Sequence, residues 1–157
     1  MVDKVFVCLV RTRDKGCELL VFRSHDEPGF EVTKGSVEPG ESLLNAAFRE
    51  LFEESGIGSV RVVAELGTTR WGREHQHFFL VETDVSVPET FRHTVTGDGP
   101  DCGRSYAFRW LPLSEDLERL LVQGCGAFAR ALLRTGQRAS RSHGSEAEVH
   151  RRRRPSS

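Results

Sequence analysis

The sequence predicts a single α/β domain, and three observations lead to that class. The chain has 157 residues, of which 38% are hydrophobic and 29% are charged, as is usual for one globular domain. Short β-rich runs lie before and after one strongly amphipathic helical segment, and a second helical segment follows them. No apolar run approaches the roughly 20 residues that a bilayer span requires, so we expect no membrane partner.

Runs rich in β-branched and aromatic residues predict the strands. The runs at 5–10 and 18–22 flank Asp14-Lys15-Gly16, whose turn-forming residues predict a hairpin. A glycine-rich loop follows over 35–41, and a longer loop with room for one short strand spans 83–105. The remaining predicted strands cover 30–32, 61–66, 76–82 and 107–111.

Residues 42–55 form the clearest predicted helix of the chain. Ser42 can cap its start, and Gly56 can end it in the left-handed conformation. A second helix is predicted over 114–133, with a break near the glycines at 124–126. The apolar stripe expected on the first helix comprises Leu43, Leu44, Ala47, Leu51 and Phe52.

The net charge of −1 is unevenly distributed along the chain. From Arg134 onward there are seven arginines and only two glutamates, so this end is basic and the remainder is acidic. Such a segment cannot bury enough apolar surface to order itself, so we predict a domain over 1–134 and a basic, disordered tail over 135–157. We expect no nucleic-acid partner; contact between the tail and nucleic acid is the alternative.

The cysteines and the N-terminal sequence bear on the compartment. The four cysteines are scattered without Cys-x-x-Cys spacing, which favours reduced thiols over a zinc site or a disulfide framework. The first residues lead directly into a predicted strand and show no signal-peptide pattern. We therefore expect a cytoplasmic protein, whose oligomeric state the sequence leaves open.

The helix over 42–55 carries more acid than a structural helix needs. Glu50, Glu53 and Glu54 stand at i, i+3 and i+4, so their carboxylates share one face and repel one another. A divalent cation would offset that repulsion, and Mg²⁺ prefers a few carboxylates together with water and substrate phosphates. The alternative is an amphipathic helix whose solvated face is acidic.

The spacing of these residues resembles the Nudix box, the signature of the Nudix hydrolase family. The matching string is Gly35, five residues, Glu41, seven residues, Arg49-Glu50-Leu51, one residue, Glu53-Glu54, one residue, Gly56-Ile57. The resemblance implies a Nudix-type α/β/α sandwich with a mixed β-sheet between helices. It also implies a hydrolase that uses Mg²⁺, or Mn²⁺ in its place, to cleave a phosphoric anhydride bond in a nucleoside diphosphate linked to another group X.

The resemblance also implies roles for the residues of the box. Arg49 would orient the acids, and Glu41 would stand behind the metal ligands as a partner of that arginine. Glu50 would be either a ligand or the base that activates water, and with Glu53 and Arg49 it makes up the expected catalytic group. Glu82, which ends a strand, is a further candidate ligand, or else an ordinary strand-end acid. The expected metal ligands in the box are Gly35, through its carbonyl, Glu50, Glu53 and Glu54.

Residues outside the box are candidates for substrate binding. Lys34 is placed to meet a phosphate, and Trp71 could stack on a nucleobase. Phe30 and His77 could line the base pocket, or belong to the core. His77 also shares a strand face with His75, but no third ligand for a second metal site is evident in the sequence. Loop acids that could supply a more distant base are Glu74, Asp98 and Asp101.

The substrate class is the least determined part of the prediction. Nucleoside or deoxynucleoside triphosphates and dinucleoside polyphosphates are the expected substrates. If the protein is a hydrolase, ADP-ribose or a nucleotide sugar is the alternative substrate. If it is not an enzyme, the alternative function is that of a sensor that binds a nucleotide without turnover.

Overall fold

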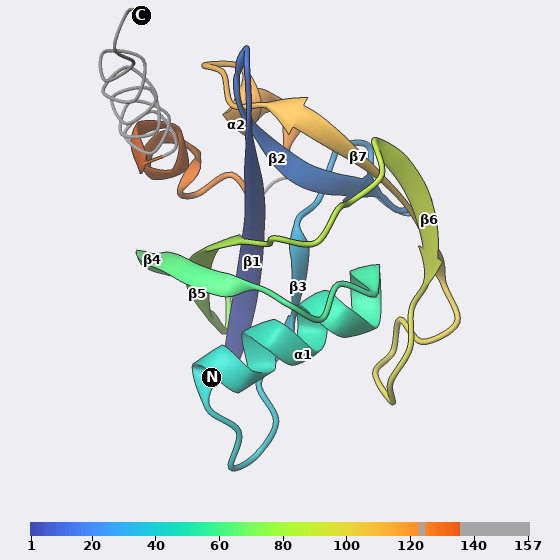
Figure 1. The fold of residues 1–157 in the computed structure, drawn as a ribbon. Helices are drawn as coiled ribbons and strands as arrows, with labels where there is room; N and C mark the ends of the chain where they lie inside the picture. Colours follow the sequence, from blue (N-terminus) through green and yellow to red (C-terminus); the bar gives the residue numbers. More distant parts are fainter. Residues whose placement is uncertain (123–124, 136–157) are drawn as a thin grey trace, which may run out of the picture.

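The structure is a computed structural model that describes residues 1–122 and 125–135. It contains one mixed β-sheet with helices on both sides (Figure 1). None of the helices in this described part is long and apolar enough to cross a membrane. The elements are β1 (Val2–Arg13), β2 (Gly16–Arg23), β3 (Thr33–Ser36), α1 (Leu43–Ser55), β4 (Arg61–Trp71), β5 (Glu74–Glu82), β6 (Thr90–Thr94), β7 (Ser105–Pro112) and α2 (Leu117–Leu120).

The long strand β1 organises the sheet. Its first half lies between β5, which runs parallel to it, and β3, which runs antiparallel, while its second half pairs with β2. The strand order is β4-β5-β1-β2-β7-β6, with β3 attached to β1 beside this path. The predicted hairpin between β1 and β2 and the short strand within 83–105 are both present.

Alternation along β1 divides the hydrophobic core into two layers, because successive side chains in a strand face opposite sides. Val5 and Val7 belong to the cluster that includes Leu51 of α1. Phe6 and Cys8 belong to the other cluster, which α2 and the later helical segment cover. The mixed sheet therefore lies between helices, as the α/β/α prediction requires.

Helix α1 has the predicted ends but a narrower apolar face. The Ser42 hydroxyl accepts a hydrogen bond from a backbone N–H at 3.1 Å, and Gly56 ends the helix at φ 79°. Ala46, Ala47 and Leu51 are fully buried, as is usual for a helix packed on a sheet. The predicted stripe was wrong for two members that are exposed to solvent, Leu44 and Phe52.

The segment around Phe30 explains two further differences from the prediction. The backbone of Phe30 pairs with Leu121 on one side, through N–H···O bonds of 3.0 and 2.8 Å that involve residues 120 and 122. Leu121 is therefore extended, so the predicted helix over 114–133 is reduced to α2 and a helical stretch at 129–135. The predicted strand at 30–32 forms only isolated bridges, and the regular strand begins at Thr33.

The predicted basic tail over 135–157 lies outside the described residues, apart from its first residue. The boundary between domain and tail therefore stays a prediction. The described part ends within the helical stretch at 129–135, where Ala129 and Leu132 are buried in the core.

Candidate active site

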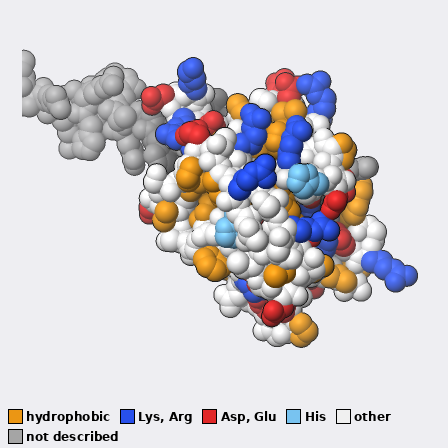
Figure 2. Space-filling view, turned by 90° about the vertical axis from the view of Figure 1, so that its right-hand side faces the viewer, with side chains coloured by type: hydrophobic (Ala, Val, Ile, Leu, Met, Phe, Trp, Pro, Cys, Tyr) orange, Lys and Arg blue, Asp and Glu red, His pale blue; other side chains and the backbone are white. Residues whose placement is uncertain are grey.

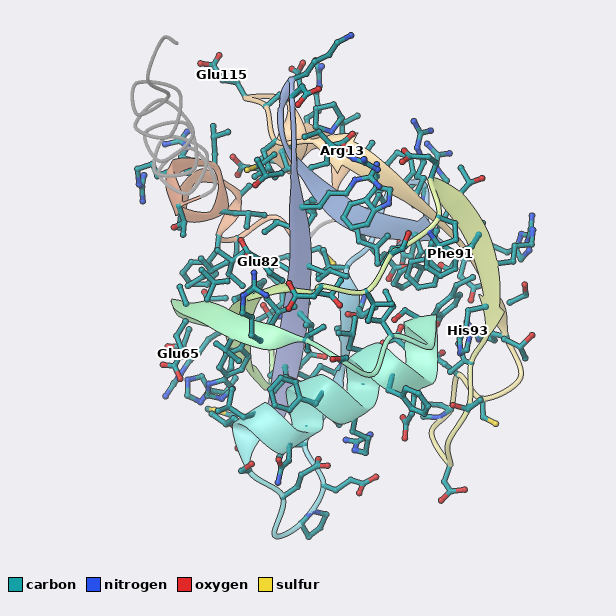
Figure 3. All side chains as sticks on the ribbon, viewed as in Figure 1. Arg13, Glu65, Glu82, Phe91, His93 and Glu115 are labelled. Carbon is teal, nitrogen blue, oxygen red and sulfur yellow. The ribbon has the colours of Figure 1, made fainter. Side chains whose placement is uncertain are left out.

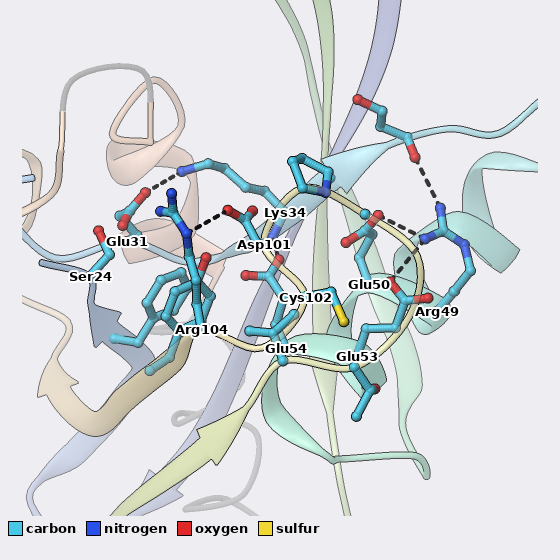
Figure 4. A pocket seen from close by; sticks show the side chains of 18 of the residues that line it. Ser24, Glu31, Lys34, Arg49, Glu50, Glu53, Glu54, Asp101, Cys102 and Arg104 are labelled. Atoms are coloured by element: carbon cyan, nitrogen blue, oxygen red, sulfur yellow. Dashed lines mark hydrogen bonds and ion pairs between the residues drawn. The ribbon is translucent and has the colours of Figure 1, made fainter. Parts of the chain in front are cut away.

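A cleft of about 440 Å³ opens between α1, β3 and the loop that joins β6 to β7 (Figure 4). Charged side chains dominate its wall, and the carboxylates of α1 point into it. This is the face of α1 on which the i, i+3, i+4 spacing placed the acids. The charged or glycine positions that matter most here are Lys34, Gly35, Glu50, Glu53, Glu54 and Arg104.

Two glycines allow the backbone to approach these carboxylates. A Cβ at Gly35 would lie 2.0 Å from the carboxyl carbon of Glu50, so a side chain there would displace the Glu50 carboxylate. A Cβ at Gly97 would lie 2.5 Å from the carboxyl carbon of Glu53, and Gly97 also has φ +93°, a conformation that favours glycine. The sequence singled out Gly35, whereas Gly97 was only part of the long loop predicted over 83–105.

Arg49 holds the acids together. Its guanidinium donates two hydrogen bonds to Glu41, at 2.7 and 2.9 Å, in the forked geometry that favours arginine. It also donates to Glu50 at 2.8 Å, to Glu53 at 3.2 Å and to the backbone carbonyl of Ser36 at 2.9 Å. The hydrogen bonds from Arg49 hold the pKa of Glu41 below its usual range.

Burial makes two carboxylates of the cleft, those of Glu50 and Glu54, costly to ionise. Glu54 is only 3% exposed, and one of its oxygens accepts the backbone N–H of Lys34 at 2.8 Å. Burial raises the pKa of Glu54 well above its usual value and raises the pKa of Glu50 to about 7. A hard divalent cation prefers oxygen ligands, and its charge would stabilise the ionised form of clustered carboxylates. The residues present therefore fit such an ion.

We expect the substitution Glu54→Gln to raise the melting temperature of the metal-free protein by about 3 °C. Glutamine removes a carboxylate that burial disfavours, and its side-chain oxygen can still accept the N–H of Lys34. Thermal unfolding in chelator measures this shift. The exposed Glu65→Gln on β4 is the matched control and should leave the melting temperature unchanged. A fall for Glu54→Gln would show that the ionised carboxylate stabilises the fold.

Two cations border the cleft on the side away from Arg49. The ammonium of Lys34 contacts Glu31 at 2.5 Å, so it is partly neutralised within the protein. Arg104 pairs with Asp26 and, at 3.6 Å, with Asp101. Sequence reasoning missed Arg104, because no motif near it in the chain marks it as a site residue.

Other residues of the cleft wall are loop acids and aromatic side chains. The loop acids Asp98 and Asp101, which the sequence suggested as candidates for a distant base, line the cleft. An aromatic pair stacked at 4.2 Å between ring centroids also borders the cleft: Phe22 and Tyr106.

Three of the candidate residues on β4 and β5 do not line the cleft. The cleft borders β3, and β1 lies between β3 and β5, so β4 and β5 are on the far side. Glu82 accepts a hydrogen bond from Arg61 at 2.7 Å instead (Figure 3). Trp71 is 47% exposed at the end of β4, and His77 contacts Asp3.

Phe30 is also outside the cleft, on the opposite face of the sheet. It is buried, and its ring lies 4.2 Å from the guanidinium of Arg23 and 5.4 Å from that of Arg109. Figure 2 shows basic side chains gathered beside hydrophobic ones on the face of the molecule that β6 borders. The Phe30 ring therefore belongs to the hydrophobic core, and two guanidinium groups lie against it. A place in the core was the alternative to a place in the base pocket.

Comparisons with known proteins give the family to which this fold and this acidic cleft belong. The NUDIX domain model matches residues 2–125. The chain therefore belongs to the Nudix family. No curated protein matches its sequence.

Solved structures with the same fold are distant in sequence. The crystal structure of C. elegans Ap4A hydrolase has a TM-score of 0.58 and 18% identity, over 88% of this chain and 97% of that one. Its binary complex has a TM-score of 0.62 and 18% identity, over 84% and 95%. A crystal structure described as a NUDIX hydrolase from Listeria monocytogenes has a TM-score of 0.64 and 16% identity, over 87% and 95%. At these identities the similarity shows the fold alone.

Proposed function

We propose that this protein is a cytoplasmic, Mg²⁺-dependent pyrophosphohydrolase that cleaves a nucleoside diphosphate linked to a group X. The observation that carries the proposal is the convergence of three carboxylates of α1 on one cleft, with Arg49 as the cation that contacts two of them. Phosphoryl transfer requires charge neutralisation and positioning of the attacking water more than covalent chemistry by the protein. The arrangement supports both requirements.

The box residues divide these tasks in the proposal. A bound Mg²⁺ or Mn²⁺ would neutralise phosphate charge and lower the pKa of a coordinated water. Arg49 orients two of the carboxylates, and Glu41 holds Arg49 from behind through its paired hydrogen bonds. Glu50, which accepts a hydrogen bond from Arg49, would be either a ligand of the ion or the base that accepts a proton from water. The residues proposed to hold the ion are Gly35, through its carbonyl, Glu50, Glu53 and Glu54.

The favoured substrates are nucleoside or deoxynucleoside triphosphates and dinucleoside polyphosphates. Lys34 and Arg104 border the cleft and offer cations to a polyphosphate chain. The cleft volume lies within the range of small-molecule sites. The fold similarity to a protein described as an Ap4A hydrolase supports testing dinucleoside polyphosphates first. ADP-ribose and nucleotide sugars are the alternative substrates.

A panel of nucleotides tests the proposal. We expect phosphate or pyrophosphate release from at least one triphosphate or dinucleoside polyphosphate in millimolar Mg²⁺, and none in chelator. The panel holds the eight common triphosphates, an oxidised dGTP, dinucleoside polyphosphates, ADP-ribose and nucleotide sugars. Release that persists in chelator would contradict the metal dependence. Tight nucleotide binding without any release would favour the sensor over the enzyme.

A further inference from the structure

Strand pairing brings a third potential ligand to the two histidines of β5. His75 and His77 are two residues apart, so their side chains face the same side of the strand. β1 runs parallel to β5, and the register places Asp3 beside His75 and Val5 beside His77. The Asp3 carboxylate therefore joins both rings on one face. These residues, Asp3, His75 and His77, are called the β1–β5 cluster below.

Two distances within the β1–β5 cluster are close to those between ligands of one metal ion. Oδ1 of Asp3 lies 3.0 Å from Nε2 of His77 and 3.3 Å from Nδ1 of His75. One ligand atom from each residue lies within 4.8 Å of the other two. In a tetrahedral Zn²⁺ site with bonds of about 2.0 Å, ligand atoms are separated by about 3.3 Å. An ion could therefore replace the protons that these groups share, with small side-chain movements.

The cluster is separate from the cleft and open to solvent. None of its three residues lines the cleft, and β1 lies between β5 and the strand that borders the cleft. The side chains of Asp3 and His75 are 52% and 37% exposed, whereas that of His77 is 12% exposed. The His77 ring is thus the least exposed of the three ligands, and the other two are accessible. An entering ion could keep a water molecule in its fourth position.

We propose that the β1–β5 cluster is a second metal site, which binds a divalent transition metal such as Zn²⁺ independently of the catalytic cleft. Two imidazole nitrogens and one carboxylate suit Zn²⁺, Cu²⁺ or Ni²⁺, whereas Mg²⁺ prefers oxygen ligands alone. The bound ion links the first residues of β1 to β5. It therefore stabilises the start of a strand that pairs with three others.

Zinc binding to the metal-free protein tests this site. The zinc affinity is measured by competition with a chromophoric zinc indicator. The full chain carries Glu53→Gln throughout, so that the cleft competes less for the ion. We expect His75→Ala to weaken zinc binding at least about tenfold, because one of three ligands is lost. That variant keeps the contact between Asp3 and His77 and therefore the local fold. Asp3→Asn and His77→Ala should weaken binding similarly, and excess Mg²⁺ should not displace the zinc.

The matched control is His25→Ala, because His25 is an exposed histidine in the loop that follows β2. It should bind zinc with the affinity of the parent protein. Unchanged affinity in His75→Ala, or an equal loss in His25→Ala, would overturn the proposal. Cobalt offers a second readout: absorption bands of a tetrahedral Co²⁺ site should appear in the parent and be absent from His75→Ala. The outcome is independent of whether the cleft hydrolyses nucleotides.

Discussion

Replacing Glu53 by glutamine should lower kcat about a thousandfold while leaving the fold intact. Glu53 contacts Arg49 at 3.2 Å and packs against Gly97, so its carboxylate is held within the cleft. Glutamine has the same shape but neither the charge nor the second acceptor oxygen that a metal ligand requires. Steady-state turnover of the best panel substrate measures the loss, and circular dichroism with thermal unfolding checks the fold.

The control for this variant is Glu65→Gln, which makes the same chemical change at an exposed position on β4 (Figure 3). It should turn over substrate at the parent rate. Mg²⁺ affinity, measured by calorimetry on the metal-free protein, should fall in Glu53→Gln and stay constant in the control. Equal turnover by Glu53→Gln and the parent would disprove the assignment of this residue as a ligand.

Replacing Arg49 by alanine should reduce both stability and turnover. The guanidinium donates five hydrogen bonds, and its loss leaves clustered carboxylates on the helix and the preceding loop without their cation. Breaking such a part-buried pair costs about 3 kcal/mol, so the metal-free protein should unfold at lower urea concentration. We expect kcat to fall about a hundredfold, because the carboxylates lose the contact that orients them.

Two further variants separate the charge of Arg49 from its geometry. Arg49→Lys keeps the charge but not the forked donor pair that Glu41 accepts, so it should recover most of the stability and less of the turnover. Arg61→Ala removes an arginine that also bridges two carboxylates, but on an exposed surface with Glu82 and Asp84. This control should leave the urea concentration at the unfolding midpoint almost unchanged. An equally small loss of stability in Arg49→Ala would mean that the hydrogen bonds of Arg49 stabilise the fold no more than an exposed ion pair does.

The sequence predicted those parts of the site that lie close together in the chain. The helical period alone places Glu50, Glu53 and Glu54 on one face, and Arg49 at i−4 from Glu53. The structure has the same helix, with Ser42 and Gly56 at its ends. Local propensity and capping suffice for such a feature, because every group involved lies within a few turns.

The sequence could not identify contacts that depend on the pairing of distant segments. Gly97 approaches Glu53, and Arg104 reaches the cleft, only because the loop between β6 and β7 folds back over α1. Trp71 and Glu82 were predicted to lie near the substrate, but the structure places them away from the cleft. Their positions follow from the strand order, which residue types do not reveal. Phe30 interrupts the late helix through backbone pairing that no local pattern marks.

The sequence by itself therefore determined the class of fold, the acidic helix and the spacing typical of a Nudix box. Tertiary structure alone decided which residues border the cleft and which do not. It also decided that Asp3 meets His75 and His77, because the parallel register of β1 and β5 brings together residues that are 72 and 74 positions apart in the chain. Periodicity within a helix or strand is local, whereas strand order and register depend on how the whole hydrophobic core is buried.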